Sequence, residues 1–139
     1  MAPVESQRLV NARGSTVWDI LTDSGNLTVW DSGITTVSGE IRNGAIIRIC
    51  TRHGGDHKFR VRVEQIPGEV MTWTRTLPPG LGAAVRTFVL TQQESMTLLL
   101  VRDEAKGPLR RLIGSPFSSS QRDLDEFVDA VRKRAEIIG

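Results

Sequence analysis

The sequence PFSSSQRDLDEFVDAVRKRAEII, residues 116–138, predicts one long amphipathic helix on which the rest of the chain packs. Its apolar side chains recur every three to four residues and therefore form one stripe along the helix. The stripe consists of Leu124, Phe127, Val128, Val131, Ala135 and Ile138. Ser115 before Pro116 is a typical start signal, because a hydroxyl can cap the first turn and proline needs no N–H partner there. A one-sided helix of this length requires a broad apolar surface to lie on.

The rest of the chain has the pattern of strands joined by short turns, which predicts an α+β fold. We expect a first strand over 4–12, two short helices over 16–22 and 26–30, and six further strands. Those six strands are predicted over 34–41, 45–53, 57–66, 69–76, 83–92 and 96–106. An antiparallel sheet of about seven strands does not stay flat, so we expect it to curve around the C-terminal helix.

The composition suits a small domain without a metal or another cofactor. The chain has 139 residues, which predicts a single domain over 1–139 with one buried core. The formal charge of +2 identifies no particular partner. The single cysteine, Cys50, excludes an internal disulfide and supplies no metal cluster. No segment has the apolar length of a membrane span or of a targeting segment, so we expect a cytoplasmic protein.

The clearest hairpin joins 45–53 to 57–66 through Gly54-Gly55-Asp56. Odd-numbered residues of both strands are mostly apolar and must therefore face the same side. The predicted pairing places His53 opposite His57, Thr51 opposite Phe59, Ile49 opposite Val61 and Ile47 opposite Val63. The other face then carries a basic strip, with Arg48 opposite Arg62 and Arg52 opposite Lys58. This strip consists of Arg48, Arg52, Lys58, Arg60 and Arg62.

The direction of the side chains is ambiguous in the next strand, 69–76. Either Met71, Trp73 and Arg75 or the residues between them face the core. We favour the register with Trp73 inward, because an isolated exposed tryptophan is the costlier arrangement. In the strand after it, Phe88 and Leu90 are expected to face inward.

Several short motifs occur in a characteristic order along nearly the whole chain. They are VWDILTD at 17–23, Trp30, Pro67-Gly68 before the strand with Trp73, and Gly107-Pro108-Leu109 before the terminal helix. In this order they resemble the START-like, helix-grip (SRPBCC) superfamily, and within it the bacterial polyketide cyclase/dehydrase-type proteins. The resemblance implies the helix-grip fold. It implies no single activity, because members bind lipids, sterols, polyketides or plant hormones, act as cyclases, or act as co-chaperones.

The resemblance also implies a ligand cavity between sheet and helix. Because hairpins alternate ends, the loops at 54–56, 77–82 and 107–115 meet at one end of the sheet, where Trp30, His53, His57, Leu81 and Phe117 would form a rim. The expected ligand-binding residues are Trp30, Ile47, Ile49, Thr51, His53, His57, Phe59, Val61, Trp73, Leu81, Phe88, Phe127 and Val131. The plainer alternative is that the rim packs on itself and the interior is solid.

His53 and His57 are the candidate acid–base groups, because imidazole titrates near neutral pH. Arg75 and Arg102 could each bind a carboxylate or phenolate of a ligand if the side chain points inward. Two histidines could also hold a metal, but no third ligand accompanies them, and a partly exposed pair beside a glycine-rich turn is the simpler alternative. No Ser-His-Asp ordering is present, so the catalytic residues stay unassigned.

The sequence therefore favours binding of a hydrophobic small molecule, of lipid, polyketide or aromatic type, between sheet and helix. An alternative is a polyketide cyclase or dehydratase that uses His53 or His57, with Arg75. A further alternative is a co-chaperone-like interaction domain that acts through the basic strip. That strip lacks the aromatic side chains on which bases stack, so we expect no nucleic-acid partner. We expect a monomer or a weak homodimer.

Overall fold

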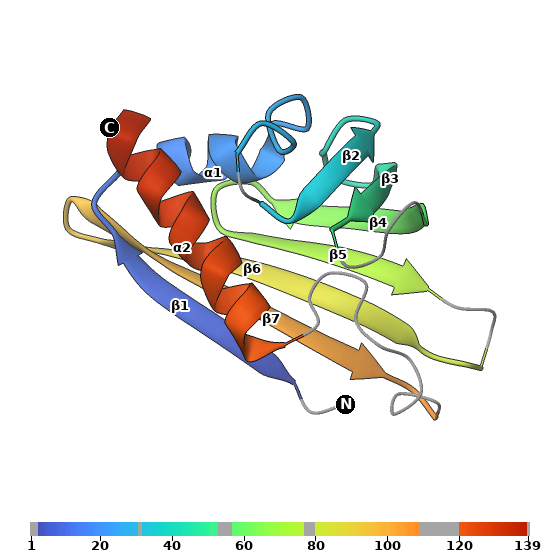
Figure 1. Ribbon diagram of the computed structural model, residues 1–139. Helices are drawn as coiled ribbons and strands as arrows, with labels where there is room; N and C mark the ends of the chain where they lie inside the picture. The colour runs from blue at the N-terminus through green and yellow to red at the C-terminus, as the bar shows by residue number, and fades with distance from the viewer. Residues whose placement is uncertain (1–2, 31, 53–56, 77–79, 109–119, 139) are drawn as a thin grey trace.

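The computed structural model of the chain describes residues 3–30, 32–52, 57–76, 80–108 and 120–138. They form a seven-stranded antiparallel sheet with a long helix, α2, across one face and a short helix, α1, near one end (Figure 1). This confirms the predicted α+β, helix-grip fold. The helices are α1 (Gly14–Thr22) and α2 (Gln121–Ile138). The strands are β1 (Val4–Val10), β2 (Ile34–Ser38), β3 (Ile46–Thr51), β4 (Phe59–Ile66), β5 (Val70–Thr76), β6 (Ala83–Gln93) and β7 (Met96–Lys106).

The strand order β1-β7-β6-β5-β4-β3-β2 leaves β1 and β2 at the two edges of the sheet. Strands β2 to β7 follow one another by hairpin connections, and β1 closes the order against β7. The ladder between β2 and β3 shifts register between Ile34 and Thr36. The core lies between the sheet and α2, which buries the predicted stripe except Ile138. Ile138, in the last turn, is 59% exposed and lines a surface pocket beside α1.

The boundaries of the helices differ from the prediction. Helix α2 begins at Gln121, where the Ser120 hydroxyl accepts a hydrogen bond of 3.2 Å from the Asp123 N–H. This serine is therefore the cap, and the expected start at Ser115 and Pro116 lies outside the described residues. The prediction of a second short helix over 26–30 is wrong, because this segment forms turns. The Ser32 hydroxyl fixes them by donating to the Leu27 carbonyl and accepting from the Ile34 N–H.

The β3–β4 hairpin has the predicted side-chain directions but a different pairing. Ile47 lies opposite Val61 and Ile49 opposite Phe59, two residues away from the predicted partners. Arg48 consequently lies opposite Arg60, not Arg62. A shift of two residues leaves every side chain on the same face, so hydrophobic alternation cannot distinguish the two pairings. His53 and the loop 54–56, on which the predicted pairing relied, lie outside the described residues.

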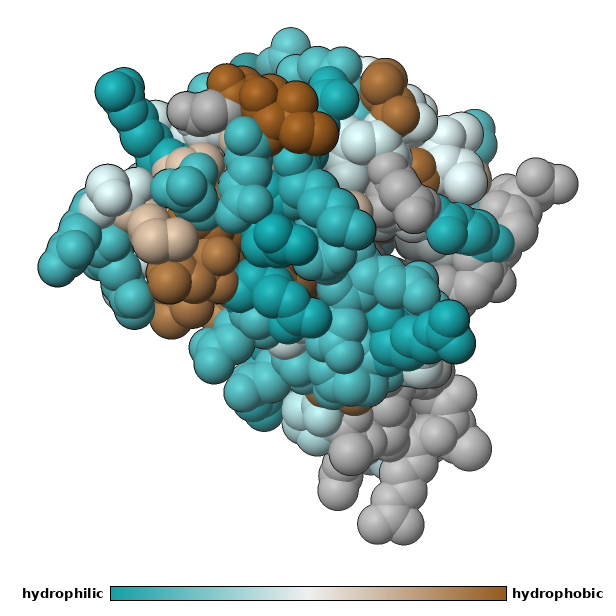
Figure 2. Space-filling view, turned by 60° about the vertical axis from the view of Figure 1, so that its left-hand side comes forward, coloured by the Kyte–Doolittle hydropathy of each residue, from teal (hydrophilic) through white to brown (hydrophobic). Residues whose placement is uncertain are grey.

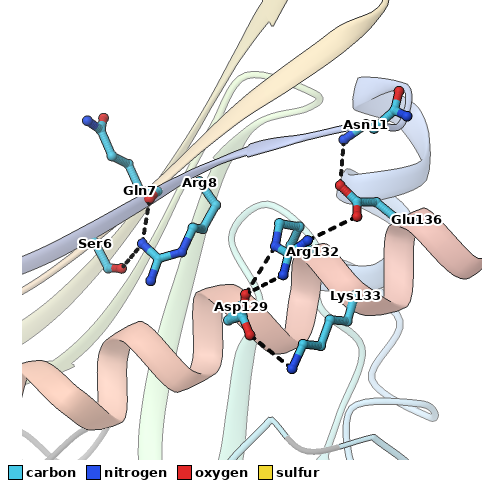
Figure 3. Close-up of polar contacts among 8 residues, drawn as sticks. All are labelled: Ser6, Gln7, Arg8, Asn11, Asp129, Arg132, Lys133 and Glu136. Atoms are coloured by element: carbon cyan, nitrogen blue, oxygen red, sulfur yellow. Dashed lines mark hydrogen bonds and ion pairs between the residues drawn. The ribbon is translucent and has the colours of Figure 1, made fainter.

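Side chains of α2 bind the backbone of the N-terminal segment at both ends of the helix, and Figure 3 shows the contact near the C-terminal end. Near the start of α2, Gln121 Nε2 donates to the Glu5 carbonyl at 2.7 Å. Near its end, Glu136 Oε2 accepts from the backbone N–H of Asn11 at 2.9 Å. Arg132 donates to the other oxygen of Glu136 at 3.1 Å and to Asp129 at 2.7 Å. The Gln121 and Glu136 contacts thus connect both ends of α2 to the N-terminal segment.

Figure 2 shows a mainly polar face on which the apolar residues form separate patches. The large apolar side chains that the described residues expose are Leu9, Val29, Ile46, Ile66, Leu81, Ile137 and Ile138. Neither described helix combines the length and the apolar character needed to cross a membrane.

Replacement of Phe127 by alanine should lower the free energy of unfolding by about 3–5 kcal/mol, because this ring is only 4% exposed beneath α2. The matched control is Ile137→Ala on the same helix, where the side chain is 82% exposed. The control should cost less than about 0.5 kcal/mol. Chemical denaturation of both variants measures the difference, and equal midpoints would contradict the assigned stripe.

Asp129 should titrate below the ordinary range of aspartate. Hydrogen bonds from Arg132 and then from Lys133 lower the pKa of this carboxyl from 3.8. A lowered folded-state pKa contributes stability above the unfolded pKa, and this contribution is lost as the pH falls through the folded value. In an NMR titration, Arg132→Gln should raise the pKa of Asp129 toward 3.8. Arg122→Gln, which removes the ion pair with Glu126 instead, should leave it unchanged.

Candidate functional site

Four aromatic rings run in a continuous series through the space between the sheet and α2. Trp73 of β5 lies edge to face with Phe88 of β6, with ring centroids 5.1 Å apart. The Phe88 centroid lies 6.2 Å from that of Phe127 on α2, and Phe127 lies 5.9 Å from Trp30. Trp73, Phe88 and Phe127 are buried, whereas Trp30 is half-buried. The series therefore extends from the centre of the sheet to the surface near α1.

A buried ion pair lies beside this series. Arg86 of β6 and Asp103 of β7 are direct partners in the ladder, and both side chains are almost fully buried. The Arg86 Nε and Nη2 atoms donate to the two carboxylate oxygens of Asp103 at 2.7 and 2.8 Å. The guanidinium carbon lies 4.7 Å from the centroid of the Phe127 ring. Two hydrogen bonds and one aromatic face thus fix the position of this charge.

This pair gives the interior a polar group that is fixed in position. Its guanidinium can orient a polar or anionic group in a site that is otherwise apolar. Small-molecule sites commonly combine an apolar lining with a few fixed polar groups of this kind.

A second cluster surrounds Phe59 at the start of β4. The His57 ring lies edge to face with the Phe59 ring at 4.7 Å between centroids. The Arg75 guanidinium carbon lies 4.7 Å from the Phe59 centroid on the neighbouring strand β5. His57 is exposed and Arg75 is half-buried, so both polar groups can meet a ligand at this end of the sheet.

Most residues that the sequence predicted as ligand contacts lie in one interior. The buried ones are Ile47, Ile49, Thr51, Phe59, Val61, Trp73, Phe88, Phe127 and Val131. His57 and Leu81 are exposed, and Trp30 is half-buried. His53 and Phe117 lie outside the described residues. The structure thus brings the apolar part of the predicted site together, and its contact with a ligand remains a prediction.

Sequence reasoning missed Arg86 and Asp103. The signal was present, because Arg86 stands two residues before the inward-facing Phe88 and Asp103 two residues after the buried Val101. Period-two alternation places both side chains inward. Arg102, which we considered as an inward group, points outward and pairs with Glu5 at 3.3 Å.

The remaining chemistry of the site is limited. No group of three or more metal-ligating side chains occurs in the part of the chain that the structure describes. The Cys50 side chain is buried and forms no disulfide. A surface pocket of about 170 Å³ lies between α1 and the end of α2. Its lining includes Asp19, Asp23, Trp30 and Arg134, so Trp30 borders both this pocket and the interior series of rings.

The curved sheet, the gripping helix and the apolar interior define a domain of the START-like class. The chain belongs to the family described as polyketide cyclase / dehydrase and lipid transport, whose model matches residues 1–136. No curated protein matches the sequence.

Solved structures that resemble the chain share its fold at low sequence identity. A START superfamily protein from Mycobacterium smegmatis has a TM-score of 0.72 and 17% identity, and the match covers 99% of each chain. The Aha1 dimer from Colwellia psychrerythraea has a TM-score of 0.74 and 16% identity, over 99% of this chain and 98% of that one. The di-domain ARO/CYC BexL of the BE-7585A biosynthetic pathway has a TM-score of 0.71 and 14% identity, over 99% and 47%.

Replacement of Asp103 by asparagine should destabilise the protein by about 3–5 kcal/mol, because it removes the countercharge of a buried cation. The double variant Arg86→Met/Asp103→Leu should recover most of this loss, since it removes both charges. Glu5→Gln, which breaks the exposed pair with Arg102, is the control and should cost less than about 1 kcal/mol. A midpoint of denaturation for Asp103→Asn equal to that of the control would show that the pair contributes little.

Proposed function

We infer that this protein binds a hydrophobic small molecule, of aromatic, acyl or polyketide type, between the sheet and α2. The observation that carries this proposal is the series of rings from Trp73 through Phe88 and Phe127 to Trp30. Aromatic faces and edges suit a flat or extended apolar ligand. Membership of a family that includes cyclases and lipid transport proteins supports the same class of ligand.

The polar groups of the interior supply the orientation of the proposed ligand. Arg86 holds a positive charge against Phe127, and Arg75 holds another against Phe59. A ligand with one acidic or phenolic oxygen would place that oxygen near a guanidinium and its apolar body along the rings. Trp30 borders the surface pocket beside α1 and also contacts Phe127, so rotation of this side chain is the proposed route by which the ligand reaches the interior.

A cyclase or dehydratase activity is the second candidate, and the cluster around Phe59 favours it. His57 and Arg75 contact the same ring, so an imidazole and a cation lie together at one end of the interior. In such an enzyme His57 would move a proton while Arg75 stabilises a developing oxyanion. Turnover of an aromatic polyketide-like substrate that depends on pH and is lost in His57→Ala would favour the enzyme over the binding protein.

A neutral solvatochromic dye tests the binding proposal, because an anionic dye would also bind exposed arginines. The dye should bind the wild type with enhanced emission. Ile49→Trp, which fills the interior, should weaken binding on the order of tenfold. Trp30→Ala should raise the rate at which the dye binds, since it removes the side chain that closes the proposed route.

Ile46→Trp is the matched control, because Ile46 lies on the same strand but is exposed on the outer face. It should bind the dye as the wild type does. Only variants that still unfold cooperatively on heating, and are therefore folded, are compared in the titration. Absence of dye binding by the folded wild type, or equal binding by the two tryptophan variants, would refute a ligand site in the interior.

A further inference from the structure

The outer face of the sheet carries three arginines in close register. Arg48 of β3 lies directly opposite Arg60 of β4, and Arg62 follows two residues along β4 on the same face. Directly opposed residues have Cβ atoms about 4.5–5.5 Å apart, and alternate residues of a strand lie about 6.8 Å apart. All three side chains are exposed. We call Arg48, Arg60 and Arg62 the outer arginine cluster.

The charges of the outer arginine cluster are only partly neutralised. Glu64 lies 3.5 Å from Arg62. Within the described ranges, no carboxylate lies within ion-pair distance of Arg48 or Arg60. Like charges directly opposite each other destabilise a sheet, so this arrangement costs the free protein stability. An anionic partner would reduce that repulsion, and the reduction would add to the free energy of binding.

The cluster borders a hollow rather than a flat surface. A pocket of about 210 Å³ lies on this face, lined by Ile46, Arg60, Arg62, Thr74 and Thr76. Ile46 lies opposite Arg62 and is 48% exposed, which gives the hollow an apolar wall. Thr74 lies opposite Arg62 on β5 and adds a hydroxyl and a methyl group. The hollow can therefore accept a side chain with both apolar and acidic character.

We propose that the outer arginine cluster and its hollow bind an acidic, extended segment of a partner protein. Arg60 and Arg62 have the two-residue spacing of one strand face, and carboxylates at alternate positions of an extended peptide have the same spacing. Each guanidinium can bind one carboxylate through a planar pair of hydrogen bonds. The residue between the two carboxylates would point away from the sheet, and the methylene groups of the Glu side chain bound to Arg62 would contact the exposed Ile46 opposite it.

Two other kinds of anionic partner fit this face less well. Nucleic acid binding usually adds aromatic stacking, and the side chains that line the described hollow are Ile, Arg and Thr. Phosphate sites at helix N-termini use converging backbone N–H groups, and the residues that line the described hollow come from strands only. Strands β3, β4 and β5 each pair on both sides, so their N–H groups lie in the plane of the sheet and are used by the ladders. An extended acidic segment needs only side chains.

The test is a titration with a labelled peptide in which Glu and Thr alternate, against a control peptide with Gln in place of Glu. The Glu peptide should bind more tightly, and its affinity should fall as salt rises. Arg60→Gln and Arg62→Gln should each weaken binding by about two- to fivefold, as expected for exposed ion pairs. Arg60→Lys should lie between wild type and Arg60→Gln, since it keeps the charge but loses the planar fork.

Arg122→Gln on α2 is the matched control, because it removes an exposed, ion-paired arginine elsewhere. It should leave peptide binding unchanged. Arg60→Gln should also raise the thermal midpoint of the free protein, because it removes the repulsion with Arg48. A gain in stability together with a loss of binding is a result that a purely structural arginine would not give.

Four results would overturn the proposal. The first is that the Glu peptide does not bind at low salt, and the second is that it binds Arg60→Gln and the wild type equally. A single-stranded oligonucleotide of the same charge binds more tightly than the peptide through the same residues, which would assign the face to nucleic acid. Pyrophosphate alone competes fully at equal concentration, which would assign it to a small anion. Changes in the amide chemical shifts on addition of the peptide locate the contact. The proposal predicts that these changes are confined to β3–β5.

Discussion

The buried ion pair between Arg86 and Asp103 is the strongest constraint on the arrangement of this protein. Removing two charges from water costs several kcal/mol for each ion, and only good geometry with hydrogen bonds offsets that cost. The pair has this geometry because β6 and β7 place the two residues directly opposite each other. A slip of one residue would turn one charge to the outer face and leave the other buried.

The register of the central strands therefore determines what surrounds the pair. β5 places Trp73 opposite Arg86, and α2 lays Phe127 on the guanidinium. The same helix side chain contacts Phe88 and Trp30, so one ring connects the charge, the sheet and the segment after α1. The proposed ligand site and the most demanding electrostatic contact of the core thus share Phe127.

The alternation of β4 gives the sheet two faces with different chemistry. Phe59, Val61 and Val63 face the interior, and Arg60, Arg62 and Glu64 face outward. The proposed small-molecule site and the proposed peptide site use opposite faces of the same strands. Substitutions on one face leave the side chains of the other in place, so the two proposals can be examined separately.

Alternation made much of the fold predictable from the sequence, and its limits explain what was missed. The number of strands, the inward direction of Trp73 and the stripe of α2 follow from periods of 2 and 3.6 residues. The pairing of β3 with β4 depends on the loop between them, which period two cannot specify. Arg86 was missed because a charged residue is not expected inside until its partner Asp103, 17 residues away, is known. The prediction placed the start of α2 at Ser115 and Pro116, which lie outside the described residues, and it did not single out Ser120, whose hydroxyl caps the described helix.

The edges of the sheet carry features that oppose the addition of a strand from another chain. An unprotected edge strand offers free N–H and C=O groups on which a neighbouring chain can add a strand and start aggregation. At β1, the side chain of Gln121 on α2 donates a hydrogen bond to the backbone carbonyl of Glu5. At β2, the strand has five residues and its ladder is irregular after Ile34, so a second chain would meet no long regular row of groups. Helix α2 thus covers part of the β1 edge of the sheet, and the short, irregular ladder of β2 disfavours strand addition at the other edge.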